Sequence, residues 1–292
     1  KEYGAEMYNF ALIGEHLSHS YSPMIHSKFG DYEYELCEVS EGDLQDLLKS
    51  EKYDGFNVTI PYKEKIIKYC DEISNDCRRI GAVNTVVKNA EGKYIGYNTD
   101  YFGFRYLLEK SDIDVAGRRC VILGSGGASK TVSVVLQDLG AKEILEVSRT
   151  GEINYENIKE CGDAEIIVNS TPVGMFPNNM KSLINLDDFP GCIGVVDLIY
   201  NPNRTKLILD AMERGIPAVS GLGMLVAQGF KASELFQGKE LDSEEISIAI
   251  EEIRDVTLNK ILIGMPGAGK TFLGMKMAEA TGREFVDIDD EI

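Results

Sequence analysis

The chain has 292 residues, with 48 acidic and 30 basic side chains and a formal net charge of −18. This charge argues against a nucleic-acid partner, whose phosphates are bound by basic surfaces, and no apolar stretch has the length that predicts a membrane helix. Six scattered cysteines without a CxxC pair indicate a reduced, cytoplasmic protein of about two domains.

The first hundred residues alternate short apolar runs with helical patterns. Strands are predicted at 8–13, 34–38 and 55–58, and helices at 42–50 and 63–70. Strands and helices in alternation are typical of a mostly parallel sheet with helices on its faces. The fold class predicted for this part of the chain is therefore α/β.

A second unit begins with the apolar run 119–123, followed at once by a glycine-rich loop and a helical pattern at 129–139. Glycines in this position let the backbone approach a pyrophosphate, which then meets the N-terminus of the helix. The loop predicts a dinucleotide site, although its pattern departs from GxGxxG and an ordinary turn is the alternative. Its residues are Gly124, Ser125, Gly126, Gly127 and Ala128.

The strand predicted at 143–147 ends in Ser148, Arg149 and Thr150. In a site for NAD, this strand end usually carries an acidic residue that binds the ribose 2′-hydroxyl. A guanidinium can instead pair with a 2′-phosphate, so the sequence favours NADP(H). The alternative is that Arg149 is an ordinary surface charge.

Further strands are predicted at 165–169, 194–197 and 216–218, and a helix at 224–236. The acidic segment 241–255 has apolar residues at helical spacing, which indicates an amphipathic surface helix or a linker.

A third unit begins at Lys260, where an apolar strand pattern, a glycine loop and a helix start follow in succession. The loop is a complete Walker A sequence, in which backbone amides hold phosphates, the lysine reaches the β and γ oxygens, and the hydroxyl can ligate Mg²⁺. Its residues are Gly264, Gly267, Gly269, Lys270 and Thr271. The residues from 260 onward are too few to bury a core, so we expect a partial domain.

Several short motifs occur in a fixed order: HSYSPMIH, NVTIPYK, GAVNT, NTD, GSGGAS, SRT, NSTPVGM, DLIYNP and GLGMLVAQG. Together they resemble the shikimate dehydrogenase family over about residues 8–238. The resemblance implies an α/β substrate domain (1–103, completed by returning helices at 223–255) and a Rossmann-type NADP-binding domain (104–222). It also implies reversible NADPH-dependent reduction of 3-dehydroshikimate to shikimate, a step of chorismate and aromatic amino-acid biosynthesis.

The resemblance assigns roles to single residues. Lys63 and Asp100 match the catalytic pair, in which the ammonium stabilises a developing alkoxide and exchanges a proton while the carboxylate orients it. Neutral side chains suit the hydroxyls and carboxylate of the substrate, and those implied are Ser20, Ser22, Asn57, Thr59, Asn84, Tyr200 and Gln228. Further cofactor residues implied are Thr171, Gly221 and Met224.

Each assignment has a structural alternative. Ser20 and Ser22 can cap a helix, Lys63 can be a surface lysine, and Asn84 can be a turn residue. Two rival functions also stand beside the first. One is a quinate/shikimate dehydrogenase that uses NAD, and the other is a catalytically silent NADP-binding regulator.

Other residues bear on the site without a predicted chemical role. The histidines His16, His19 and His26 have no acidic or cysteine partner at metal-site spacing, so we expect structural roles and no metal in the dehydrogenase. The family usually has glycine where Tyr101 follows Asp100. The only partners predicted are small molecules.

The last segment, 261–292, resembles the start of a shikimate kinase. In that family an aspartate pair after the first helix serves Mg²⁺ and the substrate, and Asp287 and Asp289 match it. The resemblance implies ATP and Mg²⁺ for an intact kinase, with Mg²⁺ at Thr271. The kinase portion (256–292) lacks that family's substrate-binding arginines and lid, so we expect it to be inactive. A generic P-loop kinase is the alternative.

Overall fold

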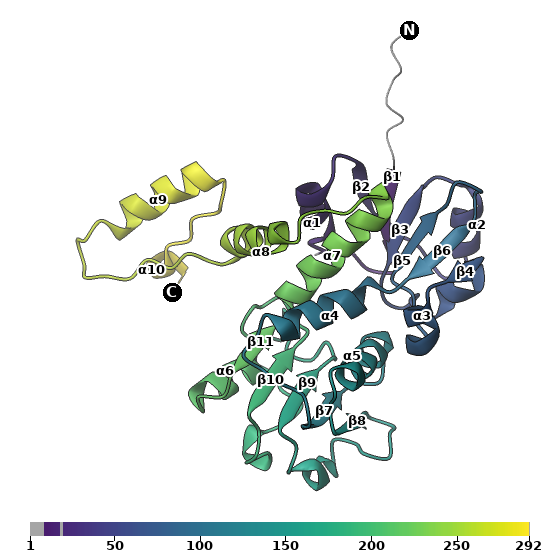
Figure 1. The fold of residues 1–292 in the computed structure, drawn as a ribbon. Helices are drawn as coiled ribbons and strands as arrows, with labels where there is room; N and C mark the ends of the chain where they lie inside the picture. The colour runs from purple at the N-terminus through teal and green to yellow at the C-terminus, as the bar shows by residue number, and fades with distance from the viewer. Residues whose placement is uncertain (1–8, 18–19, 292) are drawn as a thin grey trace. The chain divides into compact units, whose positions relative to one another are not determined.

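The computed structural model describes residues 9–17 and 20–291, so the predicted strand residue Tyr8 and His19 lie outside the described part. The chain divides into two compact units, Lys1–Ile253 and Arg254–Ile292 (Figure 1). The first unit holds two sheets, each with its own apolar core.

The first sheet has the strand order β2-β1-β3-β5-β6-β4. Its strands are β1 (Asn9–Gly14), β2 (Glu33–Glu38), β3 (Gly55–Val58), β4 (Glu72–Ile73), β5 (Thr85–Lys88) and β6 (Tyr94–Tyr97). β1 pairs in parallel with β2 and β3, whereas β5 is antiparallel to both β3 and β6. The predicted mostly parallel sheet is therefore mixed, because β5 and β6 form a hairpin that the sequence reading missed.

Helices α1 (Ser22–Phe29), α2 (Leu44–Lys49) and α3 (Asn75–Ile80) accompany this sheet. The helix predicted at 63–70 is a single 3₁₀ segment, η1 (Lys65–Tyr69). The loop before η1 is anchored by Tyr62. The side chain of Tyr62 is fully buried and donates a hydrogen bond of 2.7 Å to the Val39 carbonyl. The residue that follows, Lys63, is thus held at the edge of a packed core.

The second sheet is entirely parallel, with the order β11-β10-β9-β7-β8. Its strands are β7 (Arg119–Leu123), β8 (Glu143–Val147), β9 (Ile166–Asn169), β10 (Gly194–Asp197) and β11 (Ala218–Ser220). Helices α5 (Gly127–Asp138) and α6 (Lys206–Glu213) and the 3₁₀ segments η2 (Ile158–Cys161) and η3 (Leu186–Asp188) connect them. This Rossmann-type arrangement confirms the predicted fold of the second domain, with β11 two residues later than predicted.

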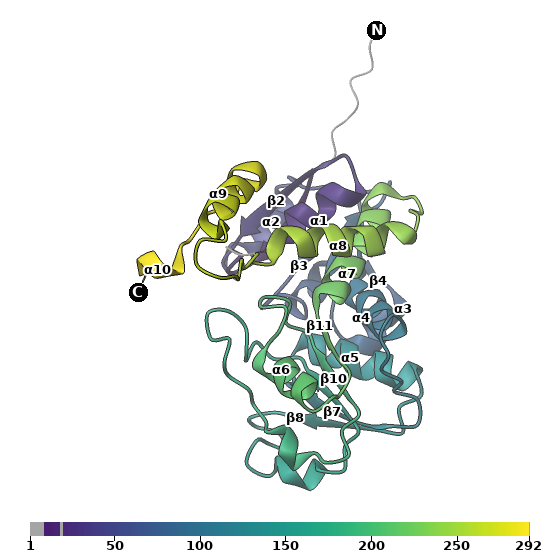
Figure 2. The same ribbon diagram turned by 90° about the vertical axis from the view of Figure 1, so that its left-hand side faces the viewer.

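Two long helices join the sheets (Figures 1 and 2). They are α4 (Thr99–Glu109) and α7 (Leu222–Gln237), which pack along one another. A Cβ added at Gly103 of α4 would lie 2.6 Å from the Met224 carbonyl oxygen of α7, so this approach requires glycine. At the far end of α7, Phe236 stacks on Phe10 of β1 with ring centroids 4.2 Å apart.

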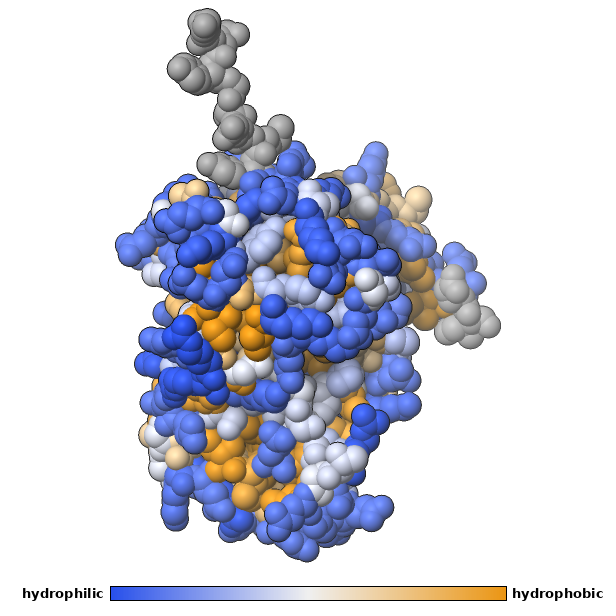
Figure 3. All heavy atoms as spheres, turned by 90° about the vertical axis from the view of Figure 1, so that its right-hand side faces the viewer, coloured by the Kyte–Doolittle hydropathy of each residue, from blue (hydrophilic) through white to orange (hydrophobic). Residues whose placement is uncertain are grey.

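Helix α8 (Glu244–Thr257) forms from the acidic segment predicted at 241–255. Of the two alternatives for this segment, the amphipathic helix is therefore confirmed and the linker is not. Its residues Ile246, Ala249 and Ile253 are buried in one cluster with Ile25 and Phe29 of α1. The face shown in Figure 3 is mostly hydrophilic, with apolar side chains gathered in smaller areas. Among the helices of the described residues, none combines the length and apolar character that a membrane crossing requires.

The second unit contains α9 (Lys270–Thr281) and α10 (Ile288–Glu291). The strand predicted to begin at Lys260 is not formed. A strand needs a paired neighbour, and the described residues of this unit contain no sheet. Ile261 and Ile263 accordingly remain 74% and 90% exposed.

Candidate active site

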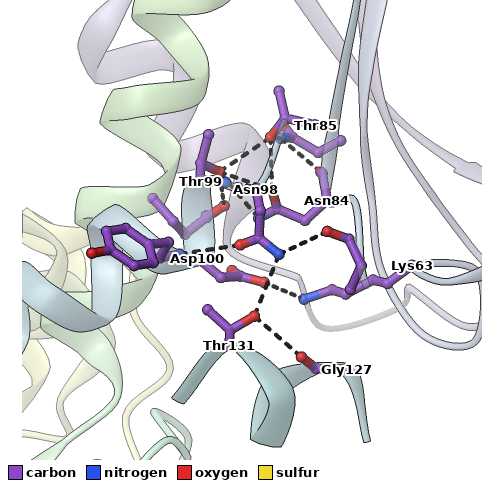
Figure 4. Close-up of polar contacts among 12 residues, drawn as sticks. Lys63, Asn84, Thr85, Asn98, Thr99, Asp100, Gly127 and Thr131 are labelled. Atoms are coloured by element: carbon purple, nitrogen blue, oxygen red, sulfur yellow. Dashed lines mark hydrogen bonds and ion pairs between the residues drawn. The ribbon is translucent and has the colours of Figure 1, made fainter. Parts of the chain in front are cut away.

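The predicted catalytic pair comes together across the first unit. Lys63 Nζ lies 2.6 Å from Asp100 Oδ2, and the two side chains are 19% and 9% exposed (Figure 4). Lys63 lies in the loop between β3 and η1, and Asp100 lies in the first turn of α4. Exposed lysines of this chain, such as Lys65, also pair with carboxylates, but the Lys63 pair is distinguished by the burial of both side chains. The surface-lysine alternative is therefore excluded.

Asn98 places Asp100 relative to the glycine-rich loop. It caps α4, because its Oδ1 accepts a hydrogen bond of 3.1 Å from the Tyr101 amide. Its Nδ2 donates to Thr131 Oγ1 of α5 at 3.3 Å, and Thr131 donates in turn to the Gly127 carbonyl at 3.2 Å (Figure 4). Helix α4, which carries Asp100, is thereby hydrogen-bonded to the N-terminal part of α5.

Gly127 also lies beside Lys63. A Cβ added there would be 3.6 Å from Lys63 Cβ and 3.7 Å from Lys63 Cδ. The Lys63–Asp100 pair and the predicted dinucleotide loop are thus neighbours. An ion pair that borders a nucleotide loop can exchange a proton with a group being reduced or oxidised there.

Amide side chains form a buried network next to this pair. Asn84 Oδ1 accepts from the Thr99 amide at 2.7 Å, and Asn57 Nδ2 donates to Thr85 Oγ1 at 2.9 Å. Thr99 Oγ1 lies 3.5 Å from Gln228 Oε1 of α7. Because Asn84 bridges to the first residue of α4, it is not a simple turn residue. Thr99 and Thr85 are members of the network that the sequence analysis missed.

The predicted serine pair is also brought together. Ser20 Oγ donates to Ser22 Oγ at 3.1 Å, and Ser22 is buried. Tyr21 is the N-cap of α1 and its side chain does not cap the helix, but Ser20 Oγ accepts a hydrogen bond of 3.2 Å from the Ser22 amide at the start of the helix. The capping alternative therefore stands for Ser20 beside its predicted role as a substrate ligand. The ring of Tyr21 packs against that of Tyr200, 5.2 Å away between centroids. Thr59 follows β3 directly and is half-buried.

Tyr34 of β2 is a further polar residue beside the predicted substrate ligands. Its hydroxyl donates to Asn57 Oδ1 at 2.8 Å, and burial raises its pKa well above the ordinary value. The His26 ring stacks on it at 3.9 Å, and His26 Nδ1 lies 2.7 Å from the Tyr32 hydroxyl. Tyr32 directly precedes β2 and Tyr34 is its second residue, so the two are spaced by two positions, and this alternation is the pattern that could have identified them.

The buried His26 predicts a loss of stability in acid. Burial lowers its pKa from 6.5 to about 3, against a smaller opposing effect of Asn57, so the folded state holds it neutral. The unfolded chain binds a proton below pH 6.5 and the folded chain does not, so stability falls as pH falls from about 6.5 toward 3. This group alone costs about 2 kcal/mol at about pH 5.

Denaturant unfolding at several pH values measures the effect in the parent and in His26→Gln. The difference in stability between them should shrink as pH falls, because the variant has no imidazole to protonate. Identical pH dependence of the two proteins would contradict this assignment.

The glycine-rich loop has room for a bound group at the carboxyl end of β7. Gly124 has φ +116, and a Cβ added there would lie 2.7 Å from Ser170 Oγ and 3.1 Å from Thr171 Cγ2. A Cβ at Gly126, the N-cap of α5, would meet nothing within 4 Å. The free backbone at the start of a 12-residue helix fits a pyrophosphate.

The end of β8 places the predicted specificity residues beside this loop. Ser148 is buried, whereas Arg149 and Thr150 are exposed. Within the described residues Arg149 takes part in no ion pair, so its charge is available to a ligand. Glu146 is the acidic residue of β8 nearest to its end. Its carboxylate accepts a hydrogen bond of 3.0 Å from Ser129 of α5 and is thus already engaged within the protein.

Two predicted cofactor residues have clear packing roles. A Cβ at Gly221 would lie 2.0 Å from the Leu198 carbonyl oxygen, so the residue must be glycine. Met224 is 8% exposed and belongs to the apolar core with Phe104. A contact of either with a cofactor stays a prediction.

Asp197 at the end of β10 organises the neighbouring loops, and the sequence analysis missed it. Its carboxylate accepts from Thr205 Oγ1 at 2.6 Å, Asn169 Nδ2 at 3.0 Å and the Ile199 amide at 3.1 Å. Burial raises its pKa to about 6. The loops that carry Thr171 and Tyr200 begin at these residues.

The Walker A loop lies in the second unit. Gly267 and Gly269 have φ of +76 and +82, and α9 begins at Lys270. Lys270 Nζ donates to the Gly264 carbonyl at 2.9 Å, and Thr271 Oγ1 lies 3.2 Å from Asp287 Oδ2. The predicted Mg²⁺ residues Thr271 and Asp287 are thus adjacent, while Asp289 is linked to Asp287 only through its amide. Within the described residues, no cluster of three or more metal-ligating side chains occurs.

Comparison with known proteins gives matches over most of the first unit. The model of the shikimate dehydrogenase substrate binding domain matches residues 12–86. The shikimate dehydrogenase (NADP(+)) of Clostridium perfringens is 38% identical over 266 residues, which cover 84% of this chain and 98% of that protein.

Solved structures match over a similar share of the chain. Shikimate dehydrogenase 1 of Peptoclostridium difficile has a TM-score of 0.79 at 37% identity, covering 85% of this chain and 98% of that one. A chorismate mutase/shikimate 5-dehydrogenase fusion protein of Clostridium acetobutylicum has a TM-score of 0.80 at 36% identity, covering 86% and 98%.

Proposed function

Because this chain belongs to the shikimate dehydrogenase family of oxidoreductases, we propose that it catalyses the reversible NADPH-dependent reduction of 3-dehydroshikimate to shikimate. The observation that carries the proposal is the Lys63–Asp100 pair at 2.6 Å, beside Gly127 of the glycine-rich loop. In that position one ammonium can serve a reacting carbonyl group next to the cofactor. The same reaction places the chain in chorismate and aromatic amino-acid biosynthesis.

The chemistry follows from the charges of the pair. When bound, the reduced nicotinamide cofactor supplies the hydride to the ring ketone. Lys63 stabilises the negative charge that develops on the oxygen and gives it a proton. Asp100 keeps the ammonium oriented through the hydrogen bond of 2.6 Å between the two side chains.

The neutral side chains around the pair suit the rest of the substrate. Ser20 and Ser22 present adjacent hydroxyls for its carboxylate, and the amide network of Asn57, Asn84 and Gln228 can bind ring hydroxyls. Neutral donors avoid a further buried charge that would need a partner. We take residues 1–103 with 223–255 as the substrate domain and 104–222 as the cofactor domain.

The fit of the cofactor rests on the loop and on the end of β8. Gly124 to Ala128 provide the close approach for the pyrophosphate, and the exposed Arg149 provides a charge for a 2′-phosphate. We therefore propose NADP(H) rather than NAD(H). All six cysteines are free, which supports the cytoplasmic location that the sequence predicts.

Initial rates with each combination of shikimate or quinate and NADP⁺ or NAD⁺ test the proposal. We expect the highest kcat/KM with shikimate and NADP⁺. A preference for quinate and NAD⁺ would favour the quinate/shikimate dehydrogenase instead. Absence of turnover together with NADP⁺ binding would favour the silent regulator.

For the second unit, we propose a partial shikimate kinase domain. Support comes from the Walker A loop and from Thr271 beside Asp287. Several apolar side chains of this unit are exposed, among them Ile263, Phe272 and Val286. In a P-loop domain, further helices and strands would cover such side chains. Lys270 alone cannot hold the phosphates, Mg²⁺ and acceptor hydroxyl in line.

We therefore expect the chain to release no ADP from ATP in a manner that depends on shikimate. Coupled ADP release in the parent and in Lys270→Ala measures this, and Lys270→Ala should keep the parent's dehydrogenase rate. ADP release that depends on shikimate and disappears in Lys270→Ala would contradict the inactive fragment.

A further inference from the structure

Helix α5 contacts the sequence neighbours of both catalytic residues. Glu64, which follows Lys63, forms an ion pair of 2.7 Å with Lys130 in the first turns of α5. Tyr101, which follows Asp100, donates a hydrogen bond of 2.8 Å from its hydroxyl to Oδ2 of Asp138. Asp138 is the last residue of α5. The two ends of one helix are thus tied to the two halves of the catalytic pair.

The contact at Asp138 is strengthened by a third element. Arg79 of α3 donates to both carboxylate oxygens of Asp138, at 2.9 Å and 2.6 Å. The guanidinium and the Tyr101 hydroxyl hold the pKa of Asp138 below its usual value, so it accepts both hydrogen bonds as an anion. Charge-assisted bonds of this kind are about twice as strong as neutral ones.

These ties lie on one face of α5. Gly127, Thr131 and Asp138 are separated by four and seven residues, which returns each to the same side of a helix. The face extends about 16 Å along the helix axis. At one end it borders the glycine-rich loop and Lys63, and at the other it borders Tyr101.

We propose that Tyr101 and Asp138 are positioning residues for the reaction. They hold the first turn of α4, and with it Asp100, in register with the helix whose N-terminus borders the cofactor loop. The proposal rests on the proposed function. This positioning role requires the tyrosine at position 101, because a glycine in the same place would have no hydroxyl to reach α5. Small displacements of a catalytic group lower the rate far more than they weaken substrate binding.

The test uses Tyr101→Phe, Asp138→Asn and the double variant in the full chain. Each should lower kcat about 5- to 20-fold while KM for shikimate stays within about two-fold. The double variant should lose less than the product of the two single losses, because Asp138→Asn weakens and Tyr101→Phe removes the same charge-assisted hydrogen bond. Asp138→Asn also weakens the pair with Arg79, so we expect its single loss to be the larger of the two. The control is Tyr106→Phe on the same helix, whose hydroxyl makes no hydrogen bond within the described residues; it should match the parent.

Hydrogen exchange of α4 without any ligand gives a second readout. Amides in the first turn of α4 should exchange several-fold faster in Tyr101→Phe than in the parent or in Tyr106→Phe.

Equal kcat in Tyr101→Phe and the parent, or additive losses in the double variant, would overturn the proposal. If Asp138→Asn does not fold, Tyr101→Phe alone decides. A parent without shikimate turnover would refute the proposed function, and the exchange result would still show whether Tyr101 holds α4.

Discussion

Replacing Lys63 with alanine is expected to lower kcat about 10²- to 10⁴-fold with only a modest change in KM. The ammonium is 2.6 Å from Asp100 and the Lys63 side chain borders Gly127 of the glycine-rich loop, so its loss removes both the proton and the charge that the alkoxide needs. Steady-state rates with shikimate and NADP⁺ measure the effect. The matched control is Lys65→Ala, an exposed lysine two residues along the chain that pairs with Glu41.

Asp100→Asn belongs to the same experiment. It should also damage turnover, and the double variant with Lys63→Ala should lose much less than the sum of the two separate losses in activation free energy, because the residues act as a unit. A kcat of Lys63→Ala within a few-fold of the parent would refute the catalytic role. Additive losses would show two independent residues rather than a pair.

Arg149→Asp should abolish the preference for NADP⁺. Arg149 is exposed at the end of β8 and free of an ion pair among the described residues, so the variant exchanges an attractive charge for a repulsive one at the 2′-phosphate. We expect kcat/KM for NADP⁺ to fall about 10- to 100-fold while that for NAD⁺ stays within a few-fold.

The control for this change is Lys142→Asp. Lys142 directly precedes β8 and is exposed, so the variant makes the same change of charge at the opposite end of the same strand. Its cofactor preference should equal that of the parent. Equal kcat/KM of the parent for the two cofactors, or an equal loss in both variants, would show that Arg149 does not recognise the 2′-phosphate.

Prediction from the sequence was most exact for the buried parallel strands. β7 and β10 have the predicted bounds, because a strand covered on both faces is a continuous apolar run that ends where polar loop residues begin. β8 also has the predicted bounds, although it is a partly exposed edge strand. The hairpin of β5 and β6 was missed because its alternation is short. The strand at Lys260 was wrong because an apolar run becomes a strand only when another strand pairs with it.

The site was predicted through motifs, and its geometry depends on tertiary contacts. Lys63 and Asp100 are 37 positions apart, and no local pattern places them together. Tyr34 and Thr131 were missed because each acts through a partner on another element, Asn57 for the first and Asn98 for the second. Arg149 could be proposed from the sequence because its predicted role depends on the end of a single strand.

The stacking of Phe236 on Phe10 has a consequence for synthesis of the protein. The small apolar cluster that these rings form with Ala232 closes only when the first strand meets the end of α7. A nascent chain that emerges from the ribosome in order therefore exposes Phe10 until more than two hundred later residues have been added. Domains that are completed only by a late segment depend on delayed collapse or on chaperones during translation. The first hundred residues, expressed alone, would lack one side of their own core.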